Sequence, residues 1–455
     1  MTDSPSGTPA TPSYAEVEAA LLGRWPESKL EPSLDRIQAL TELLGDPQRA
    51  YPVVHLTGTN GKTSTSRMID TLIRARGLRT GRFTSPHVES MTERISVDGE
   101  PLSEERFVQA YADVAPFLEL VDADSDHPLS FFETVVGMAF AAFADAPVDV
   151  AVLEVGMGGS WDATNVADGS VAVITPIAVD HTQYLGVRPV DIAVEKAGII
   201  KPGAQVVVAE QADDVMAVIA ERAREVGATV YRENVDFGVV NQAAAVGGQV
   251  MSVRGLRAEY EELFLPLYGA HQAQNAVLAL VAAELLTGDD ALSDEMVREA
   301  FAEVTSPGRL EVVRRGPTVL LDAAHNPHGA AASVEAIRSS FTFDPLVGVV
   351  GMMADKDVEG FLSELEPVLS EIVCTQSSSA RSLTAEQLAE VAIDLFGEHR
   401  VRVTPRLDDA IEEAVTLAET GGSLGESIGS GGVLVTGSVV TVGEARHLLR
   451  RAGSR

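Results

Sequence analysis

The first chemistry that the sequence suggests is phosphate binding, by the segment Gly58-Thr59-Asn60-Gly61-Lys62-Thr63-Ser64. The segment follows the apolar run 52–56 and precedes a stretch compatible with a helix, which predicts a strand, a tight loop and a helix start. In that order, glycines let backbone N–H groups approach an anion, and the lysine neutralises its charge. The loop is shorter than the usual P-loop, whose first glycine would stand at Leu56. We interpret it as a nucleotide site, and the alternative is an ordinary Gly-Asn turn before a helix.

Two other strand-like runs end in side chains that could bind a metal ion or move a proton. The run 150–153 leads to Glu154 and then to glycines. A carboxylate at the carboxyl end of a parallel strand, near a phosphate loop, is typical of Mg²⁺ binding, and the alternative is a cap on the next turn. The run 174–179 leads to His181. Hard cations prefer oxygen, so the residue type alone leaves a structural role and acid–base chemistry equally open for His181.

The scarcity of lysine draws attention to Lys196. The chain has five lysines among its 34 lysine and arginine residues, which suggests that the retained lysines do what arginine cannot. Lys196 closes a predicted helix at 188–197, where a cation complements the helix dipole. The alternative is that its amine adds carbon dioxide, which gives a carbamate whose oxygens could help to hold a metal assembly.

A similar strand end occurs in the second half of the chain. The run 318–321 leads to Asp322 and His325, and Asn275 and Arg309 flank the segment that joins the two halves. The planar guanidinium of Arg309 could bridge a nucleotide phosphate across the two halves, or it could form a salt bridge with one of many acidic residues.

Elements that could position these residues follow an α/β pattern, because apolar β-branched runs alternate with stretches of helical period. The alternation predicts parallel sheets with helices on both faces, and it breaks between 236 and 267, where antiparallel strands are expected. We expect helices at 62–76, 103–118, 130–145, 188–197, 213–227, 271–287 and 293–303. We expect strands at 51–57, 79–84, 149–155, 170–175, 204–208, 229–231, 235–240, 249–253, 263–267, 317–321, 346–351, 371–375, 400–404 and 433–437.

The breaker cluster at 305–308 separates two apolar systems and predicts two domains. We expect a disordered tail at 1–14 and a first domain at 15–304 that has a mostly parallel sheet and a small antiparallel subsheet. A linker at 305–309 would lead to a Rossmann-like α/β domain at 310–455. Two lobes joined by a short linker favour a ligand cleft between them.

Composition limits the function and the location. A net charge of −33 over 455 residues argues against sequence-independent binding to nucleic acid, which needs basic surface. The single cysteine, Cys374, excludes an intrachain disulfide and suits a reducing compartment. No signal peptide is recognisable, and no apolar run is long enough to span a bilayer. We expect a cytoplasmic protein that binds no membrane.

Taken together, these segments resemble the bifunctional dihydrofolate synthase/folylpolyglutamate synthase family of the Mur ligase superfamily. Two positions depart from the family pattern: Thr63 stands where many members have Gly, and Ser160-Trp161 stands where many have Arg-Leu. The resemblance extends to Gly437-Ser438 and is carried by the segments 58–63, 83–88, 93–95, 130–133, 153–159, 162–165, 180–182, 195–199, 322–327 and 355–357.

The resemblance implies a role for each of the residues that match. Contacts with ATP would come from Thr59, Asn60, Gly61, Lys62, Thr63, Ser64, Asn275, Arg309 and Asp322. Ligands to Mg²⁺ would be Ser85, Glu154 and His181, catalysis would depend on Lys62, Lys196, His181 and Glu154, and Lys196 would be carbamylated (N6-carboxylysine). The pterin substrate would be bordered by Glu31, Pro32, Ser33, Ser130, Phe131, Phe132, Glu133, Trp161, Asp162 and Ala163, and the incoming glutamate would meet His325 and Ser438.

The implied reaction is ATP-dependent ligation of L-glutamate to dihydropteroate, which forms dihydrofolate, and to reduced folates, which forms polyglutamates, through an acyl phosphate. ATP, two Mg²⁺ ions and a monovalent cation are the implied cofactors, and a monomer is expected. One alternative is a Mur peptidoglycan ligase that uses a UDP-sugar substrate; the segments 85–87 and 131–133 argue against it. Another is a non-catalytic nucleotide-binding protein; the presence of Glu154, His181 and Lys196 argues against that class.

Overall fold

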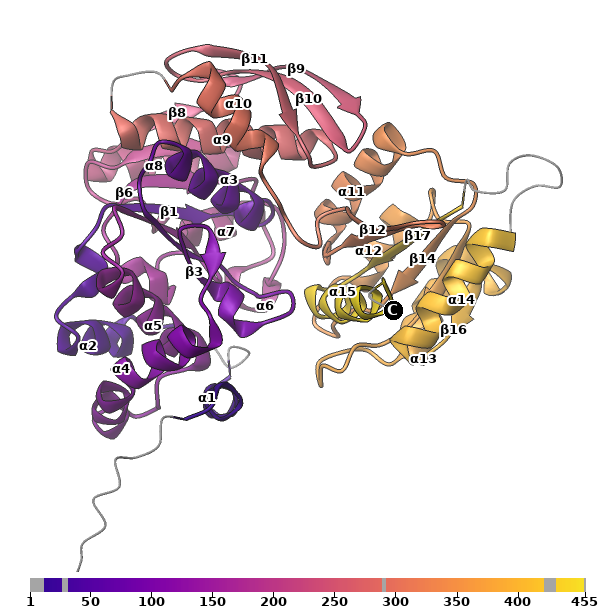
Figure 1. Ribbon diagram of the computed structural model, residues 1–455, viewed down its shortest axis with the longest axis horizontal. Helices are drawn as coiled ribbons and strands as arrows, with labels where there is room; N and C mark the ends of the chain where they lie inside the picture. Colours follow the sequence, from indigo (N-terminus) through magenta and orange to yellow (C-terminus); the bar gives the residue numbers. More distant parts are fainter. Residues whose placement is uncertain (1–11, 27–31, 289–291, 421–430, 454–455) are drawn as a thin grey trace, which may run out of the picture.

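The computed structural model describes residues 12–26, 32–288, 292–420 and 431–453, which form two α/β lobes side by side (Figure 1). We call the described residues up to 302 the N-terminal lobe and those from 311 the C-terminal lobe. Most of the predicted tail lies outside the described residues, and helix α1 (Tyr14–Leu22) begins at Tyr14, capped by Ser13. Among the helices of the described residues, none combines the length and the apolar character that crossing a membrane requires.

An eight-stranded sheet forms the centre of the N-terminal lobe, in the order β4-β3-β2-β5-β1-β6-β7-β8. From β2 to β8 neighbouring strands are parallel, and β3 and β4 add an antiparallel edge that the sequence pattern did not predict. The strands are β1 (Val53–Thr57), β2 (Thr80–Phe83), β3 (Ile95–Val97), β4 (Glu100–Pro101), β5 (Val150–Glu154), β6 (Gly169–Ile174), β7 (Gln205–Val208) and β8 (Thr229–Arg232).

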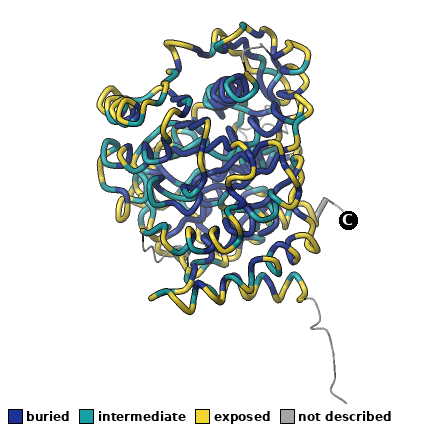
Figure 2. Tube along the Cα trace, turned by 90° about the vertical axis from the view of Figure 1, so that its left-hand side faces the viewer, coloured by how far each residue is buried: buried dark blue, intermediate teal, exposed yellow. Residues whose placement is uncertain are grey.

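Helices cover both faces of this sheet and bury its apolar side chains. Figure 2 shows buried segments gathered inside the molecule and exposed segments around them. One face packs against α3 and α9, and the other packs against α1, α2, α4 and α5. The helices are α2 (Asp35–Leu43), α3 (Lys62–Ala75), α4 (Glu104–Ala123), α5 (Phe131–Asp145), α6 (Thr182–Leu185), α7 (Pro189–Ala197), α8 (Asp213–Val226), α9 (Ala270–Thr287) and α10 (Asp294–Ala302), with 3₁₀ turns η1 (Pro47–Arg49), η2 (Met91–Arg94) and η3 (Ala163–Val166).

The predicted antiparallel subsheet is present and packs on α9 and α10. Its strands are β9 (Gly238–Ala245), β10 (Gly248–Arg254) and β11 (Glu259–Leu265), in the order β11-β10-β9. Buried side chains of this subsheet, among them Met251 and Leu263, join the core that α3 and α9 form with the main sheet.

The C-terminal lobe is built on a sheet in the order β12-β13-β17-β14-β15-β16, parallel from β13 onward. Strand β12 pairs antiparallel with β13 and was not predicted. The strands are β12 (Glu311–Arg315), β13 (Thr318–Asp322), β14 (Leu346–Val350), β15 (Glu371–Cys374), β16 (Val401–Val403) and β17 (Gly432–Thr436). The helices are α11 (Pro327–Ser340), α12 (Val358–Leu365), α13 (Ala385–Phe396), α14 (Leu407–Thr420) and α15 (Val439–Gly453), with η4 (Glu398–Arg400).

The predicted fold class is therefore confirmed: a mostly parallel sheet with a small antiparallel subsheet, followed by a second α/β lobe. Residues 303–310, which join the lobes, form neither helix nor strand. The loops that follow β1, β5, β6 and β13 all reach the same cavity between the lobes. The fold thus brings the predicted strand-end residues to one place.

Candidate active site

The predicted phosphate-binding segment is the turn between β1 and α3. Its glycines, Gly58 and Gly61, have φ angles of 150° and 89°, which side-chain-bearing residues rarely adopt. A Cβ atom on Gly61 would lie 2.5 Å from Oδ1 of Asn275, and one on Gly58 would overlap the hydroxyl of Thr175. Glycine is therefore required at both positions. The turn lines the cavity, so its N–H groups and the N-terminus of α3 can meet an anion.

Hydrogen bonds brace this turn against the segment that follows β6. The backbone N–H of Thr59 donates to Pro176 O at 2.9 Å, and its hydroxyl donates to Ala178 O at 2.8 Å. The hydroxyl of Thr175 donates to Asn60 O at 2.7 Å. The position of the turn is thus coupled to the chain that leads to residues 180 and 181.

Two lysines converge on one carbonyl oxygen of the turn. Lys62 Nζ donates to Gly58 O at 3.0 Å, and Lys196 Nζ, from the end of α7, donates to the same oxygen at 2.8 Å. Burial lowers the pKa of both ammonium groups, and the charge of Lys62 lowers the pKa of Lys196 further. The neutral amine is the form of lysine that can add carbon dioxide, so this environment favours carbamate formation at Lys196.

Glu154, at the end of β5, has one carboxylate oxygen to offer a ligand. It is 1% exposed, and its Oε1 accepts a hydrogen bond of 2.8 Å from the hydroxyl of Thr63. Its Oε2 is buried and has no hydrogen-bond partner among the described residues. Burial raises the pKa of Glu154, and the nearby Lys62 acts against that shift.

The oxygen atoms that this part of the cavity offers fit Mg²⁺. The unpartnered oxygen of Glu154 and the hydroxyl of Ser85, which lines the same cavity, are the hard oxygen ligands that Mg²⁺ prefers. The described part of the chain contains no group of three His, Cys, Asp or Glu side chains placed to hold a metal ion. Much of the coordination shell would therefore come from water and phosphate oxygens, as is usual for Mg²⁺.

His181 also lines the cavity, as the N-terminal cap of α6, with a left-handed φ of 51°. Burial lowers the pKa of its imidazole to about 3, although the adjacent Asp180 acts in the opposite direction. The ring is therefore neutral near pH 7, and its unprotonated nitrogen could bind a metal ion, as the family resemblance implies. Of the two roles that the residue type left open, a structural role is compatible with this position, whereas so low a pKa makes the ring a weak base near neutral pH.

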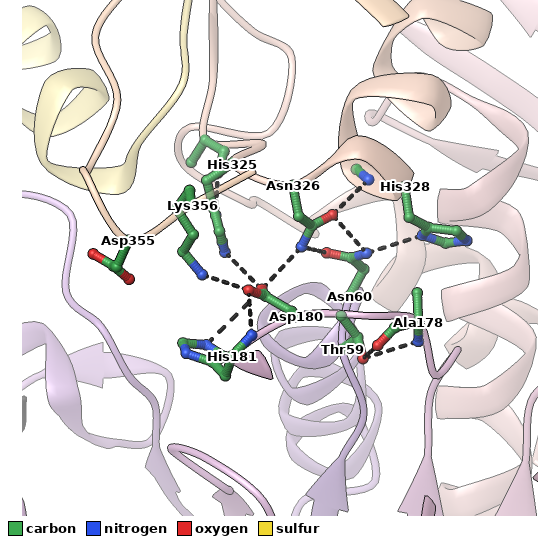
Figure 3. Close-up of polar contacts among 12 residues, drawn as sticks. Thr59, Asn60, Ala178, Asp180, His181, His325, Asn326, His328, Asp355 and Lys356 are labelled. Carbon is green, nitrogen blue, oxygen red and sulfur yellow. Dashed lines mark hydrogen bonds and ion pairs between the residues drawn. The ribbon is translucent and has the colours of Figure 1, made fainter. Parts of the chain in front are cut away.

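Asp180 is the centre of a polar cluster between the lobes that sequence reasoning missed (Figure 3). Its Oδ1 lies 2.6 Å from Nζ of Lys356, and its Oδ2 accepts from Nδ2 of Asn326 at 3.1 Å and lies 3.6 Å from Nε2 of His325. Burial raises the pKa of Asp180, but His325, His181 and Lys356 outweigh this effect and lower it overall. Asp180 is therefore a carboxylate held by the C-terminal lobe.

The phosphate-binding turn itself also contacts the C-terminal lobe. The amides of Asn60 and Asn326 exchange hydrogen bonds of 3.2 and 3.1 Å, and Asn60 Nδ2 lies 2.9 Å from Nδ1 of His328 (Figure 3). Two sequence signals were available: Asp180 stands beside His181, and Lys356 is one of only five lysines in the chain. Neither signal showed that these residues meet.

The linker and the C-terminal wall of the cavity are also tightly hydrogen-bonded. The hydroxyls of Ser64 and Ser306 lie 3.0 Å apart, which ties the linker to α3. Asp322 is buried and accepts from Leu310 N at 3.0 Å, Ala324 N at 3.1 Å and the Ser333 hydroxyl at 2.7 Å. On the N-terminal side, Asn275 donates to Gln272 at 3.1 Å.

The cavity between the lobes has a volume of about 640 Å³. The predicted ATP, metal, catalytic and modified residues all line it, together with one of the two candidates for the glutamate site. These residues are Thr59, Asn60, Gly61, Lys62, Thr63, Ser64, Ser85, Glu154, His181, Lys196, Asn275, Arg309, Asp322 and His325. The other glutamate candidate, Ser438, does not line the cavity; it caps α15 by accepting from Thr441 N at 3.0 Å, and the next residue, Val439, reaches the cavity.

None of the described members of the predicted pterin set lines the cavity, and Glu31 lies outside the described residues. Ser130 caps α5 in a reciprocal pair with Glu133, which also binds Arg36 at 3.1 Å. Asp162 is buried and accepts from Met157 N at 2.9 Å, and so holds the glycine loop that does line the cavity. The remaining members are Pro32, Ser33, Phe131, Phe132, Trp161 and Ala163.

Phe132 and Trp161 pack against that loop, and Phe131 stacks with Arg94. The guanidinium of Arg94 lies 4.8 Å from the centre of the Phe131 ring, and Phe132 packs edge-on against Phe83 and occupies the space beside Gly156. The Trp161 ring lies against Gly158 in the same way. These aromatic side chains shape the loop next to the cavity.

Comparison with known proteins gives a consistent result over nearly the whole chain. Residues 56–283 match the Mur ligase middle domain, and residues 308–439 match the Mur ligase glutamate ligase domain. The chain is 48% identical over 475 residues to the dihydrofolate synthase/folylpolyglutamate synthase of Mycobacterium tuberculosis, which covers 99% of this chain and 98% of that protein.

Solved structures agree with the sequence comparison. The Mycobacterium tuberculosis folylpolyglutamate synthase complexed with ADP superimposes with a TM-score of 0.92 at 48% identity, over 96% of this chain and 98% of that one. The E. coli FolC in complex with DHPP and ADP superimposes with a TM-score of 0.84 at 29% identity, over 98% of this chain and all (100%) of that one.

Proposed function

The chain belongs to the dihydrofolate synthase/folylpolyglutamate synthase family of Mur ligases, and from this we propose that its interlobe cavity ligates L-glutamate to dihydropteroate and to reduced folates at the expense of ATP. One observation carries the proposal: the phosphate-binding turn, the half-buried Lys62, the buried Lys196 and a free carboxylate oxygen share a cavity with side chains of a second lobe. That arrangement suits a reaction that joins two substrates after a phosphoryl transfer.

The first step activates the carboxylate of the pteroate or folate. A carboxylate is a poor acylating agent because its leaving group would be oxide, so ATP transfers its γ-phosphoryl group to one carboxylate oxygen and ADP leaves. The turn N–H groups and Lys62 stabilise the charge on the phosphoryl oxygens, and Arg309 reaches the nucleotide from the linker. Mg²⁺, bound at Ser85, Glu154 and His181, would screen the phosphate charge.

The second step forms the amide. The neutral amine of glutamate attacks the acyl carbonyl carbon, the bond from that carbon to the phosphate oxygen breaks, and inorganic phosphate leaves with the proton that the nitrogen loses. Because water would hydrolyse the acyl phosphate, the lobes must keep bulk water out. The contacts of Asp180 and Asn60 with the C-terminal lobe support that role.

Lys196 contributes to this site as a carbamate in our proposal. Its amine is buried, its pKa is lowered, and it sits on the carbonyl of Gly58 beside Lys62. A carbamate would place two oxygens that share one negative charge next to that ammonium group and next to the residues proposed to bind Mg²⁺. Several further points stay predictions. For the site, they are the pterin set, the glutamate residues His325 and Ser438, a second Mg²⁺ and a monovalent cation. For the whole protein, they are the domain boundaries, the cytoplasmic location and the monomeric state.

The test is glutamate-dependent release of phosphate from ATP with dihydropteroate and, separately, with reduced folates, with the products sized by mass spectrometry. We expect dihydrofolate from the first substrate and a ladder of added glutamates from the second. Phosphate release that requires a UDP-muramoyl substrate would assign the site to a peptidoglycan ligase. ADP binding without turnover on any acceptor would assign it to a non-catalytic protein.

A further inference from the structure

Helix α15 connects the active-site cavity to the N-terminal lobe. Its first residue, Val439, lines the cavity, and the helix lies on the side of the C-terminal lobe that faces the N-terminal lobe (Figure 1). One turn along the helix, Gly443 packs on the carbonyl of Val88 so closely that a Cβ atom would overlap the oxygen. A backbone contact of this kind leaves little freedom to slide, so α15 and the loop 85–90, here called the Ser85 loop, must move together.

Arg446, on the same helix, joins three parts of the chain. Its Nη1 lies 2.9 Å from Oε1 of Glu89 in the Ser85 loop, and its Nε lies 2.9 Å from Oε2 of Glu311 at the start of β12. Arg446 is 8% exposed, so water competes little for these bonds. The planar fork of a guanidinium can hold two carboxylates at once, which a lysine ammonium cannot do with the same geometry.

Each carboxylate leads to a different part of the active site. On one side, Glu93 accepts from the N–H groups of Val88, at 2.8 Å, and Glu89, at 3.0 Å, which makes the Ser85 loop a single hydrogen-bonded unit. On the other side, Glu311 accepts from Gly308 N at 2.9 Å, directly beside Arg309. The contact with Glu89 therefore reaches the loop that carries Ser85, and the contact with Glu311 reaches the linker that carries Arg309.

We infer that Arg446 is a positioning residue that holds the Ser85 loop and the Arg309 linker in place together, each through its own carboxylate. Arg446 follows Val439 by seven residues, about 10 Å along the helix axis, so it acts through these partners rather than on a substrate. The inference rests on the proposed function, in which Ser85 serves Mg²⁺ and Arg309 serves the nucleotide.

The experiment is titration calorimetry of ADP on the full-length protein, once with Mg²⁺ and once with a chelator. Four variants are compared with the wild type: Arg446→Met, Glu89→Gln, Glu311→Gln and the control Arg400→Met. Arg400 is also a partly buried arginine of the C-terminal lobe with an ion pair, to Glu366, but it has no place in the cavity lining. Thermal melting of each variant measures the loss of stability separately.

The two carboxylate variants should separate the two contacts. Glu89→Gln should reduce the gain in ADP affinity that Mg²⁺ provides and leave the metal-free affinity unchanged. Glu311→Gln should weaken metal-free binding and leave the gain from Mg²⁺ unchanged. Arg446→Met should do both, with at least about a fivefold loss of ADP affinity in Mg²⁺. Arg446→Lys should rescue only part of this loss, because an ammonium group lacks the fork.

The control shows which result overturns the inference. Arg400→Met should lower the melting temperature and change neither affinity. If Arg446→Met behaves in the same way, or if Glu89→Gln and Glu311→Gln give identical changes, Arg446 is only a stabilising residue. If Arg446→Met does not fold, the two glutamate variants still decide the question. Because ADP binding needs no folate, a protein that fails the phosphate-release assay but shows this split would refute the proposed function alone.

Discussion

The cavity has an N-terminal wall, lined by residues of the N-terminal lobe, and a C-terminal wall, lined by residues of the C-terminal lobe and the linker. The two walls differ in how many hydrogen bonds the protein itself gives to their polar groups. On the N-terminal wall, Lys62 and Lys196 donate only to carbonyl oxygens of the phosphate-binding turn, and Glu154 keeps one buried oxygen unpartnered within the described part of the chain. On the C-terminal wall, Asp322 accepts three hydrogen bonds from its own lobe and linker.

This difference indicates a division of labour between the walls. Charged groups that the protein itself leaves under-compensated cost free energy, so their presence points to a charged ligand that compensates them. Groups that are already saturated can serve only through their position. We therefore expect substitutions on the N-terminal wall to lower the rate of the reaction most. Substitutions at the contact between the lobes should mainly affect how the two lobes are held together.

The largest effect is expected from Lys62→Ala. Removing the ammonium group that, in the proposed mechanism, faces the transferred phosphoryl group should lower kcat by at least about 1,000-fold, on the order of 4 kcal/mol of transition-state stabilisation. Glutamate-dependent phosphate release measures this loss. Lys201→Ala is the matched control, because Lys201 donates to Asn165 O and does not line the cavity. A near-normal rate in Lys62→Ala would remove the N-terminal wall from the mechanism.

Lys196 tests whether the second lysine of this wall acts as a carbamate. We expect the wild type, transferred to bicarbonate buffer, to gain the mass of one carbon dioxide by native mass spectrometry, and Lys196→Ala to gain none. Lys62→Ala should still gain it, which distinguishes the amine of Lys196 from that of Lys62. Lys196→Ala should lower kcat by about 100-fold, since a group that supports charge at the metal site is lost. An unmodified, fully active wild type in bicarbonate would contradict the assignment.

The elements that carry the N-terminal wall could be predicted from the sequence because their signals are local. Strands β1 and β5 are fully buried and mostly apolar. The glycines at 58 and 61 mark a turn that other residue types could not form without strain. Strands β3, β4 and β12 were missed because they are short or mix polar and apolar residues at a sheet edge. Such strands depend on a neighbour rather than on their own pattern.

The contacts between the walls could not be predicted, because they depend on how two separately folded lobes meet. Asp180 and Lys356 are 176 residues apart in the chain, and each lies in a loop that follows a strand of a different sheet. A sequence motif marks each loop, but nothing in either motif gives the distance between them. The same reason explains why Arg446 was not recognised: its two partners lie in the Ser85 loop and at the start of β12, beside the linker.

A smaller effect is expected from Lys356→Met, which breaks the interlobe ion pair. The Lys356 and Asp180 side chains are 9% and 10% exposed, so the variant leaves a nearly buried carboxylate without its closest cation. We expect the free energy of unfolding to fall by about 2 kcal/mol, measured by calorimetric melting. The double variant with Asp180→Asn should lose less than the sum of the single variants. Strictly additive losses would show that the pair does not couple the lobes.

The smallest effect concerns His271, whose charged neighbours come from the opposite wall and the linker. Burial, with smaller contributions from Arg309 and His328, lowers the pKa of its imidazole to about 4 against the pull of Asp322. The unfolded chain, with a pKa near 6.5, therefore binds this proton first. The stability that neutral His271 provides is complete above pH 6.5 and is lost as the pH falls from 6.5 toward 4.

His271→Gln removes this titration and leaves the other histidines in place. Between pH 6.5 and 4 the wild type should lose about 1 kcal/mol more stability than the variant, as measured by melting curves at half-unit steps. Parallel pH profiles would mean that His271 is solvated and that the interface is open at this point. A steeper fall of stability with pH in the wild type than in the variant would assign part of the acid sensitivity to the contact between the two walls. It would also support the view that the C-terminal wall acts mainly through its position.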